Sequence, residues 1–218
     1  MEKTQPTQPV NESKNTAENL KKKKNTIITV AVIIFVAIAG YIAWDAYKTK
    51  ANEKSELALA QVNQDKLMAA PSDSVLLAQY LKVAKEGSIG GKTAALEAAV
   101  ILYRDTAYAD CIKALDKAGS LDSKIAEAGR LSLMGDCYVN LNKLDDGLKC
   151  YKKAVSAADK NPEIVPFMLI KEANIYRAQG KYADESKAYE EILKNYPEYA
   201  NSHDVQKYAE RAAAAAKQ

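Results

Sequence analysis

Few residues in this sequence have the types and spacing that catalysis requires. The run Gly87–Thr93 resembles a phosphate-binding loop. However, three residues separate its first Gly from Gly-Lys-Thr, and the phosphate-loop motif needs four. The pattern before the run predicts a helix, where a phosphate loop would follow a strand. We therefore interpret this stretch as a linker between helices.

The His and carboxylate side chains also lack the neighbouring residues that a metal site or catalytic site needs. The chain has one His, His203, which excludes a His-based metal site or triad, and we expect it to be exposed near a helix start. The carboxylate pairs Asp145-Asp146 and Glu190-Glu191 are flanked by Lys residues. Such mixed charge is typical of a solvated helix surface. We predict no enzyme activity, no cofactor and no metal site.

The three Cys residues leave two interpretations open. Cys111, Cys137 and Cys150 fall in predicted helices, at positions suited to small apolar residues. They are either small buried thiols or, for Cys137 and Cys150, a disulfide between neighbouring helices in an oxidising compartment. Three Cys are too few for a disulfide-stapled scaffold.

The composition favours a helical protein with a substantial core. Of the 218 residues, 48% are apolar and 27% are charged, which excludes wholesale disorder. The formal net charge of +3 is too balanced for a nucleic-acid-binding protein. With only 9 Gly and 6 Pro, the chain is predicted to be all-α.

An uncharged run from Thr26 to Trp44 predicts a single transmembrane helix over residues 26–46. At about 1.5 Å per residue it is roughly 28 Å long, close to the thickness of a bilayer's hydrocarbon core. Lys21 to Lys24 precede it, and aromatic residues gather at its far end: Tyr41, Trp44 and Tyr47. The positive-inside rule places the N-terminus in the cytoplasm and the rest of the chain across the membrane.

Two alternatives to an uncleaved anchor are a buried core helix and a cleaved signal peptide. Ala37-Ile38-Ala39 fits a cleavage site, but the apolar run continues past it, so we adopt the anchor. The polar residues 1–25 are expected to form a disordered cytoplasmic tail. Residues 47–91 should form a stalk that continues the membrane helix to Pro71, followed by leading helices.

A helix–turn–helix unit recurs in the second half of the chain. The offset is 38 residues from Tyr138 to Tyr176, and a weaker earlier copy has an offset of 36 from Tyr108 to Leu144. The small residues at one repeated position would let paired helices approach closely: Ala99, Gly135 and Ala173.

The last copy resembles the tetratricopeptide repeat (TPR) family. The matching residues are Ala173, Tyr176, Gly180, Tyr182, Tyr189 and Pro197. The offsets exceed the family's 34 residues, and Asn142 replaces the turn Gly in the middle copy. The resemblance implies a TPR-like solenoid of about three repeats in residues 92–218, with a C-terminal capping helix over 201–216.

The same resemblance implies a partner-binding groove on the first helices of the repeats. The family's groove positions map to Tyr103, Arg104, Asp136, Val139, Asn140, Ile170, Asn174 and Arg177. Their mixed polar and apolar character suits extended or helical polypeptide segments. We expect protein or peptide partners, and neither nucleic acid nor a small-molecule substrate.

One anchor followed by a short repeat domain is similar to the layout of the YfgM-like ancillary subunits of the bacterial Sec translocon. That resemblance implies a single-pass protein of the bacterial inner membrane, with a periplasmic repeat domain that contacts translocon subunits and periplasmic chaperones. The implied function is a non-enzymatic adaptor. The alternative is a structural scaffold for a cell-envelope or division assembly.

Overall fold

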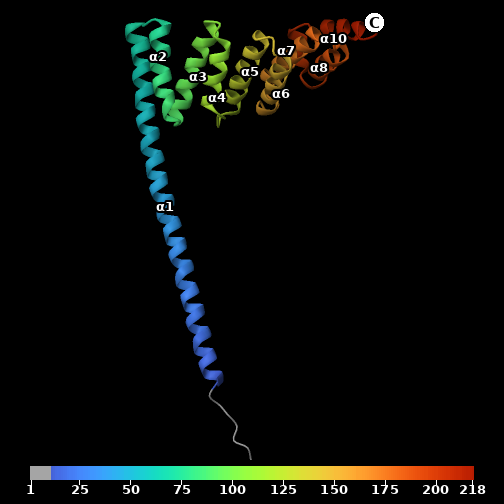
Figure 1. Ribbon diagram of the computed structural model, residues 1–218. Helices are drawn as coiled ribbons and strands as arrows, with labels where there is room; N and C mark the ends of the chain where they lie inside the picture. Colours follow the sequence, from blue (N-terminus) through green and yellow to red (C-terminus); the bar gives the residue numbers. More distant parts are fainter. Residues whose placement is uncertain (1–10) are drawn as a thin grey trace, which may run out of the picture. The chain divides into compact units, whose positions relative to one another are not determined.

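The computed structural model describes residues 11–218, except for the side chains of residues 11–22, 25–28, 31 and 86. The chain forms two compact units, Met1–Ala51 and Asn52–Gln218. Its described part is helical throughout, with no strand (Figure 1). The helices are α1 (Asn11–Ala69), α2 (Asp73–Val83), the 3-10 helix η1 (Ala84–Glu86), α3 (Ile89–Arg104), α4 (Tyr108–Ala118), α5 (Lys124–Asn140), α6 (Leu144–Ala157), α7 (Ile164–Ala178), α8 (Tyr182–Asn195), α9 (Pro197–Ser202) and α10 (Val205–Ala215).

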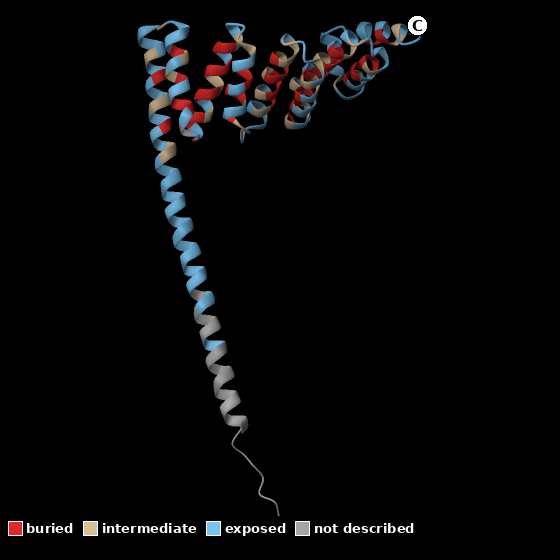
Figure 2. Cartoon of the chain, in the orientation of Figure 1, coloured by how far each residue is buried: buried red, intermediate tan, exposed pale blue. Residues whose placement is uncertain are grey.

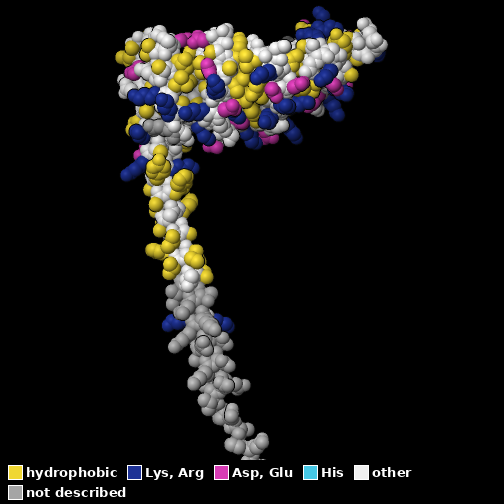
Figure 3. Space-filling model, in the orientation of Figure 1, with side chains coloured by type: hydrophobic (Ala, Val, Ile, Leu, Met, Phe, Trp, Pro, Cys, Tyr) yellow, Lys and Arg dark blue, Asp and Glu magenta, His cyan; other side chains and the backbone are white. Residues whose placement is uncertain are grey.

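The first unit consists of the N-terminal part of α1. The stretch Val32–Ala69 includes a window long and apolar enough to cross a membrane, with a mean hydropathy of 1.4 and none of it buried. Large apolar side chains such as Phe35 and Ile42 are exposed there (Figure 3). An exposed apolar surface of this kind is typical of a helix whose surroundings are lipid or another protein.

The start of α1 differs from the predicted tail. We expected residues 1–25 to be disordered, but the helix begins at Asn11, and residues 1–10 lie outside the described part of the chain. Residues 17–24 are rich in Ala, Glu, Leu and Lys. These are strong helix formers, so the helix can extend in front of the apolar run.

The second unit is a row of antiparallel helix pairs. The end of α1 packs against α2, and the hydroxyl of Tyr80 donates a hydrogen bond to Asn63 Oδ1 at 2.9 Å. The chain turns at Pro71, as predicted, because Pro cannot continue a helix. The pairs α3–α4, α5–α6 and α7–α8 follow (Figure 1).

The core is divided among neighbouring pairs, as expected for a repeat fold. Four clusters of buried residues follow one another along the row (Figure 2). They centre on Tyr80, Leu115, Tyr151 and Ile192, each no more than 3% exposed. Each pair therefore depends on its neighbours to bury its apolar face.

The turn inside each repeat has the same geometry. Thr106, Asn142 and Gly180 all adopt a left-handed conformation, with φ of 59°, 58° and 70°. The next residue donates its N–H to the carbonyl five residues earlier, as Lys143 does to Tyr138 at 2.8 Å. This is the hydrogen bond of a Schellman helix end. Asn142 thus performs the task of the family's turn Gly.

Because the turns are equivalent, the extra residues of the long repeats lie between one turn and the next. The connections between the repeats comprise residues 119–123 and 158–163. The helix pairs also differ in length, because α4 has 11 residues whereas α6 and α8 have 14 each.

Gly135 shows why small residues recur on the first helix of each pair. A Cβ added there would lie 2.7 Å from Cδ1 of the buried Tyr151 ring and closer still to Cε1. Tyr151 of α6 therefore packs directly on the α5 backbone within its own repeat. Contacts of this kind fix the spacing between α5 and α6.

The C-terminal cap comprises two helices. Pro197 ends α8, as predicted, but it also begins α9 as its first residue, a position where its missing N–H leaves no hydrogen bond unmade. The last helix, α10, packs on α8, where Arg211 contacts the buried Glu185 at 3.2 Å. The predicted capping helix over 201–216 therefore corresponds to α10.

Candidate functional site

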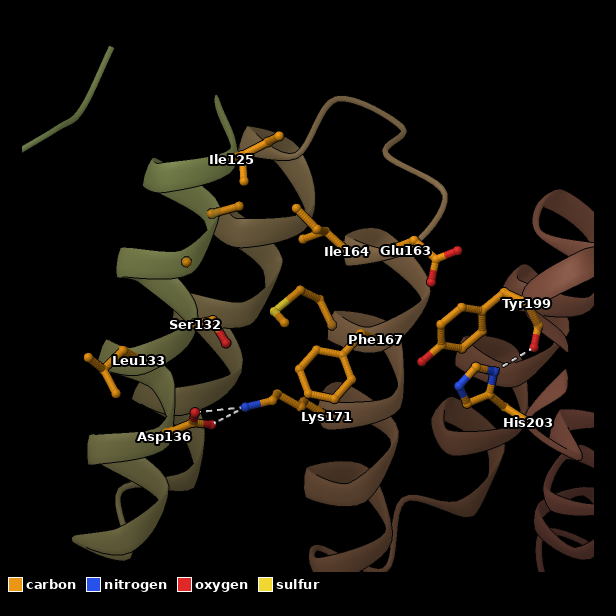
Figure 4. Close-up of a pocket in the computed structure, with 13 residues that line it drawn as sticks. Ile125, Ser132, Leu133, Asp136, Glu163, Ile164, Phe167, Lys171, Tyr199 and His203 are labelled. Atoms are coloured by element: carbon orange, nitrogen blue, oxygen red, sulfur yellow. Dashed lines mark hydrogen bonds and ion pairs between the residues drawn. The ribbon is translucent and has the colours of Figure 1, made fainter. Parts of the chain in front are cut away.

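An open pocket of about 700 Å³ lies on the first helices of the second and third repeats. We call it the α5–α7 pocket. Its lining residues are Ile125, Ala128, Gly129, Ser132, Leu133 and Asp136 from α5, Glu163 before α7, Ile164, Phe167, Met168 and Lys171 from α7, Tyr199 from α9, and His203. Figure 4 shows Phe167 and Lys171 between Asp136 and the Tyr199–His203 pair.

The pocket exposes apolar side chains that a folded domain normally buries. Ile125 is 61% exposed and Phe167 is 47% exposed. Gly129 also lines the pocket, and apart from its chain neighbours and its own helix backbone nothing lies within 4 Å of the position that a Cβ would occupy. Apolar surface around unfilled space is typical of a binding site.

Polar groups meet at one end of the pocket. Lys171 Nζ lies 2.5 and 2.7 Å from the two carboxylate oxygens of Asp136, and the hydroxyl of Tyr151 donates to Asp136 Oδ1 at 2.5 Å. Lys171 also lies over the rings of Phe167 and Tyr151, 5.1 and 5.4 Å from their centroids. Burial, followed by the hydrogen bond to Asp136, raises the pKa of Tyr151. The phenol therefore stays protonated and keeps donating.

The opposite wall comes from α9, which the repeat pattern did not predict. The rings of Tyr199 and His203 stack with centroids 3.9 Å apart and planes 7° from parallel. His203 Nδ1 lies 2.9 Å from the carbonyl oxygen of Tyr199 (Figure 4). His203 is exposed and lies between the end of α9 and the start of α10 at Val205, near a helix start as expected.

The structure places only Asp136, of the eight predicted groove residues, in this pocket. Val139 and Asn174 line a neighbouring pocket of about 200 Å³, which also includes Lys171. Arg177 donates to Asn174 Oδ1 at 3.0 Å and is exposed. Ile170 is half-buried against the C-terminal core cluster.

The remaining predicted residues lie on α3 and α5 and do not line the α5–α7 pocket. Arg104 pairs with Asp73 of α2 at 3.0 Å, and both side chains are well exposed. Tyr103 packs edge-on against Tyr108, with ring centroids 5.5 Å apart. Asn140 donates to the Asp136 carbonyl within its own helix at 2.8 Å.

Sequence reasoning missed the pocket's main residues because it placed the groove toward the C-terminal ends of the first helices. Ile125, Gly129 and Phe167 lie toward the N-terminal ends of α5 and α7. A signal that could have found the site is Phe167, an aromatic residue next to the small and polar positions of a repeat helix. Nothing in the repeat spacing could have located Tyr199.

Glu172 is buried on another side of α7, with 5% of its surface exposed. It lines a cavity of about 240 Å³ together with Lys152 of α6 and three charged residues of α8: Asp184, Lys187 and Glu191. Burial, partly offset by Lys152, raises the pKa of the Glu172 carboxyl to about 7. This group therefore titrates near neutral pH.

The three Cys residues are buried free thiols. The disulfide considered between Cys137 and Cys150 is not formed, and Cys137 has the thiol of Cys111 on α4 as its hydrogen-bond partner. The physical reason is that Cys137 faces the preceding repeat. That hydrogen bond and burial raise the pKa of Cys137, and burial raises that of Cys150. Both are therefore poor nucleophiles.

The phosphate-loop-like run has a packing role instead. The linker expected there is shorter than predicted, because α3 already begins at Ile89. A Cβ on Gly90 would lie 2.6 Å from the backbone carbonyl of Ser55 on α1, so Gly is needed for this close approach. Among the described residues, no group of three or more His, Cys, Asp or Glu side chains could hold a metal ion.

Comparison with known proteins supports the fold of the chain but identifies no family. No protein-family model matches the sequence, and no curated protein matches it. A crystal structure of MamA protein is similar, with a TM-score of 0.54, 14% identity, and coverage of 76% of this chain and 89% of that chain.

Two crystal structures of a Podosopora anserina putative kinesin light chain with nearly identical TPR-like repeats align less well. Their TM-scores are 0.45 and 0.44, and their sequence identities are 10% and 11%. The alignments cover 78% and 77% of this chain and 95% of each of those chains. With its three equivalent turns, the chain has the all-α, TPR-like fold that the sequence predicted.

Proposed function

We propose that this protein is a non-enzymatic, membrane-anchored adaptor that holds a segment of another polypeptide in the α5–α7 pocket. The observation that carries the proposal is the exposed apolar lining around the space next to Gly129. Ile125 and Phe167 offer apolar contact, and the Asp136–Lys171 pair adds a fixed polar end. This combination suits a peptide segment with at least one buried side chain.

The anchor determines where the pocket acts. Lys21 to Lys24 precede the apolar part of α1, and this charge bias favours a cytoplasmic N-terminus. The repeat domain would then lie in the periplasm of a bacterial cell. Tethering it to the inner membrane raises its effective concentration beside other membrane-bound machinery.

We further propose translocon subunits and periplasmic chaperones as partners. The support is the similarity in layout to YfgM-like ancillary subunits of the Sec translocon: one anchor followed by a short helical repeat domain. In this role the pocket would pass newly exported chains toward folding factors.

Photo-crosslinking from the pocket tests the proposal. A photoreactive amino acid replaces Phe167 in the full-length chain within living cells, and the control places it at Lys153, which is exposed on α6 and outside the pocket. We expect adducts with translocon subunits, chaperones or exported chains from position 167 alone. The same adducts from both positions would contradict a role for the pocket. Capture of a single envelope-assembly component would instead favour the scaffold alternative.

The orientation needs a separate test. Protease added to spheroplasts should digest the repeat domain and spare the residues before the anchor. Protection of the repeat domain would contradict the periplasmic location while leaving the pocket's binding role open to the crosslinking result.

A further inference from the structure

The charged residues of the α5–α7 pocket differ in whether they are free to pair with a ligand. Its lining includes two acidic residues, Asp136 and Glu163, and one Lys, Lys171. Lys171 contacts both oxygens of Asp136, and the two charges cancel. Within the described part of the chain, Glu163 takes part in no ion pair. The pocket therefore presents one carboxylate without a counter-charge.

The backbone that carries Glu163 is fixed. Asn161 Oδ1 accepts hydrogen bonds from the N–H groups of Glu163 and Ile164, both at 3.0 Å. This side-chain bond caps the start of α7. In Figure 4 the Glu163 carboxylate lies at the rim, near Tyr199. Glu163 is exposed, so a bound ligand can reach it.

The apolar part of the pocket lies one helical turn away. Phe167 follows Glu163 by four residues, which corresponds to about 6 Å along the helix axis. Gly129 faces this region from α5, and nothing fills the space above it. A side chain from a partner can therefore approach the α5 backbone at Gly129, because no side chain from another part of the chain covers this position.

We propose that the pocket selects a peptide segment with a bulky apolar side chain, which packs against Gly129 and Phe167, and with a Lys or Arg that pairs with Glu163. This inference rests on the proposed function and specifies its ligand. The distance of about 6 Å corresponds to two residues in an extended segment, at about 3.3 Å each, or to four residues in a helix. The segment therefore carries its cation at one of these two spacings from its anchor.

Selection from random sequences tests this specificity even though the partner is unidentified. The full-length protein in lipid nanodiscs is used to pan a phage library of 12-residue random peptides. Phage that also bind the G129W variant are removed, because Trp at this position would fill the pocket. Selected sequences are synthesised with a fluorescent label, and their affinities are measured by fluorescence anisotropy. We expect an aliphatic or aromatic residue paired with Lys or Arg at the predicted spacing.

Charge reversal at Glu163 then tests the pairing. The E163K variant should weaken binding of these peptides by about tenfold, and replacing the peptide's cation by Glu should restore binding to E163K. Circular dichroism of each variant checks that the fold is intact. Sequences without a cation, or affinities unaffected by E163K, would overturn this inference while leaving peptide binding in the pocket intact.

A different result would refute the proposed function itself. If no peptide binds wild type more tightly than G129W, the pocket does not hold polypeptide. The K153W variant serves as the matched control, because it places the same bulky side chain at an exposed position of α6 outside the pocket and should leave binding unchanged.

Discussion

Lys171 on α7 and Asp136 on α5 join the second and third repeats across the pocket. Both contacts are short, at 2.5 and 2.7 Å, and the two side chains are only 18% and 23% exposed. The Asp136 carboxylate also accepts from Tyr151 of α6. Its oxygens are therefore already occupied by the protein. We conclude that Asp136, predicted as a partner-binding residue, holds the repeats in register.

Removing this carboxylate should destabilise the repeat domain. The substitution Asp136→Ala leaves the largely buried Lys171 without its counter-charge, and we expect the free energy of unfolding to fall by about 2–3 kcal/mol. Urea denaturation followed by circular dichroism measures the change. Asp146→Ala is the control, because its pair with Lys149 is exposed and should contribute about 0.5 kcal/mol or less. Equal effects of the two substitutions would show that Asp136 does not hold the second and third repeats together.

Two glycines of α5 should respond in opposite ways to the same change. Gly129→Ala adds a methyl group to open space and should stabilise the helix by about 0.5–1 kcal/mol. Gly135→Ala forces a methyl group into the ring of Tyr151 and should destabilise the domain by about 1–3 kcal/mol. Thermal unfolding of the two variants provides the comparison. A shift of the same sign in both would contradict the packing described for α5 and α6.

The equivalent turns predict a second pair of opposite effects. Thr106 is β-branched and adopts a φ of 59°, a conformation unfavourable for such residues. Thr106→Gly should therefore raise the free energy of unfolding by about 1 kcal/mol, and Gly180→Ala should lower it by about the same amount. Denaturation midpoints of both variants test this. Destabilisation by Thr106→Gly would mean that its side chain makes a contact worth more than the backbone strain.

Glu172 should make stability depend on pH. Its pKa of about 7 in the folded state exceeds the ordinary value of 4.5, so folding favours the protonated carboxyl. Its stabilising contribution is complete below about pH 4.5 and is lost as the pH rises through 7. At pH 8, Glu172→Gln should be more stable than wild type by up to about 3 kcal/mol, and this advantage should disappear near pH 5.

Urea denaturation of wild type and Glu172→Gln at both pH values measures this dependence. The charged groups facing Glu172 are Lys152, Asp184, Lys187 and Glu191, and all remain in the variant. A stability difference that stays constant between pH 5 and pH 8 would show that Glu172 is already ionised in the folded protein.

The fold was predictable because its main determinants repeat. Small residues at Ala99, Gly135 and Ala173 and the recurring aromatic residues reveal the helix pairs, and each pair has the same turn. The left-handed conformation of Thr106 was not predictable, because the requirement comes from the Schellman hydrogen bond and not from the residue type. The helical start at Asn11 was missed because low apolar content was taken as a sign of disorder.

The site was less predictable than the fold. Family positions identify a face of the first helices and not where space remains on it, so Asp136 alone of the eight predicted residues lines the α5–α7 pocket. The space depends on the absence of a side chain at Gly129 and on the position of Tyr199, which comes from a helix outside the repeat pattern. Arg104 has an intramolecular partner, Asp73, that no local pattern reveals.

Binding of a partner segment to the pocket is the central claim, and equilibrium titration tests it most directly. The segment identified by crosslinking at position 167 is synthesised as a peptide and titrated calorimetrically into the full-length protein in nanodiscs. We predict one bound peptide per chain, similar affinity for Lys153→Trp on the exposed surface of α6, and at least tenfold weaker binding to Gly129→Trp with its helical content unchanged. Undiminished affinity for Gly129→Trp would contradict the account.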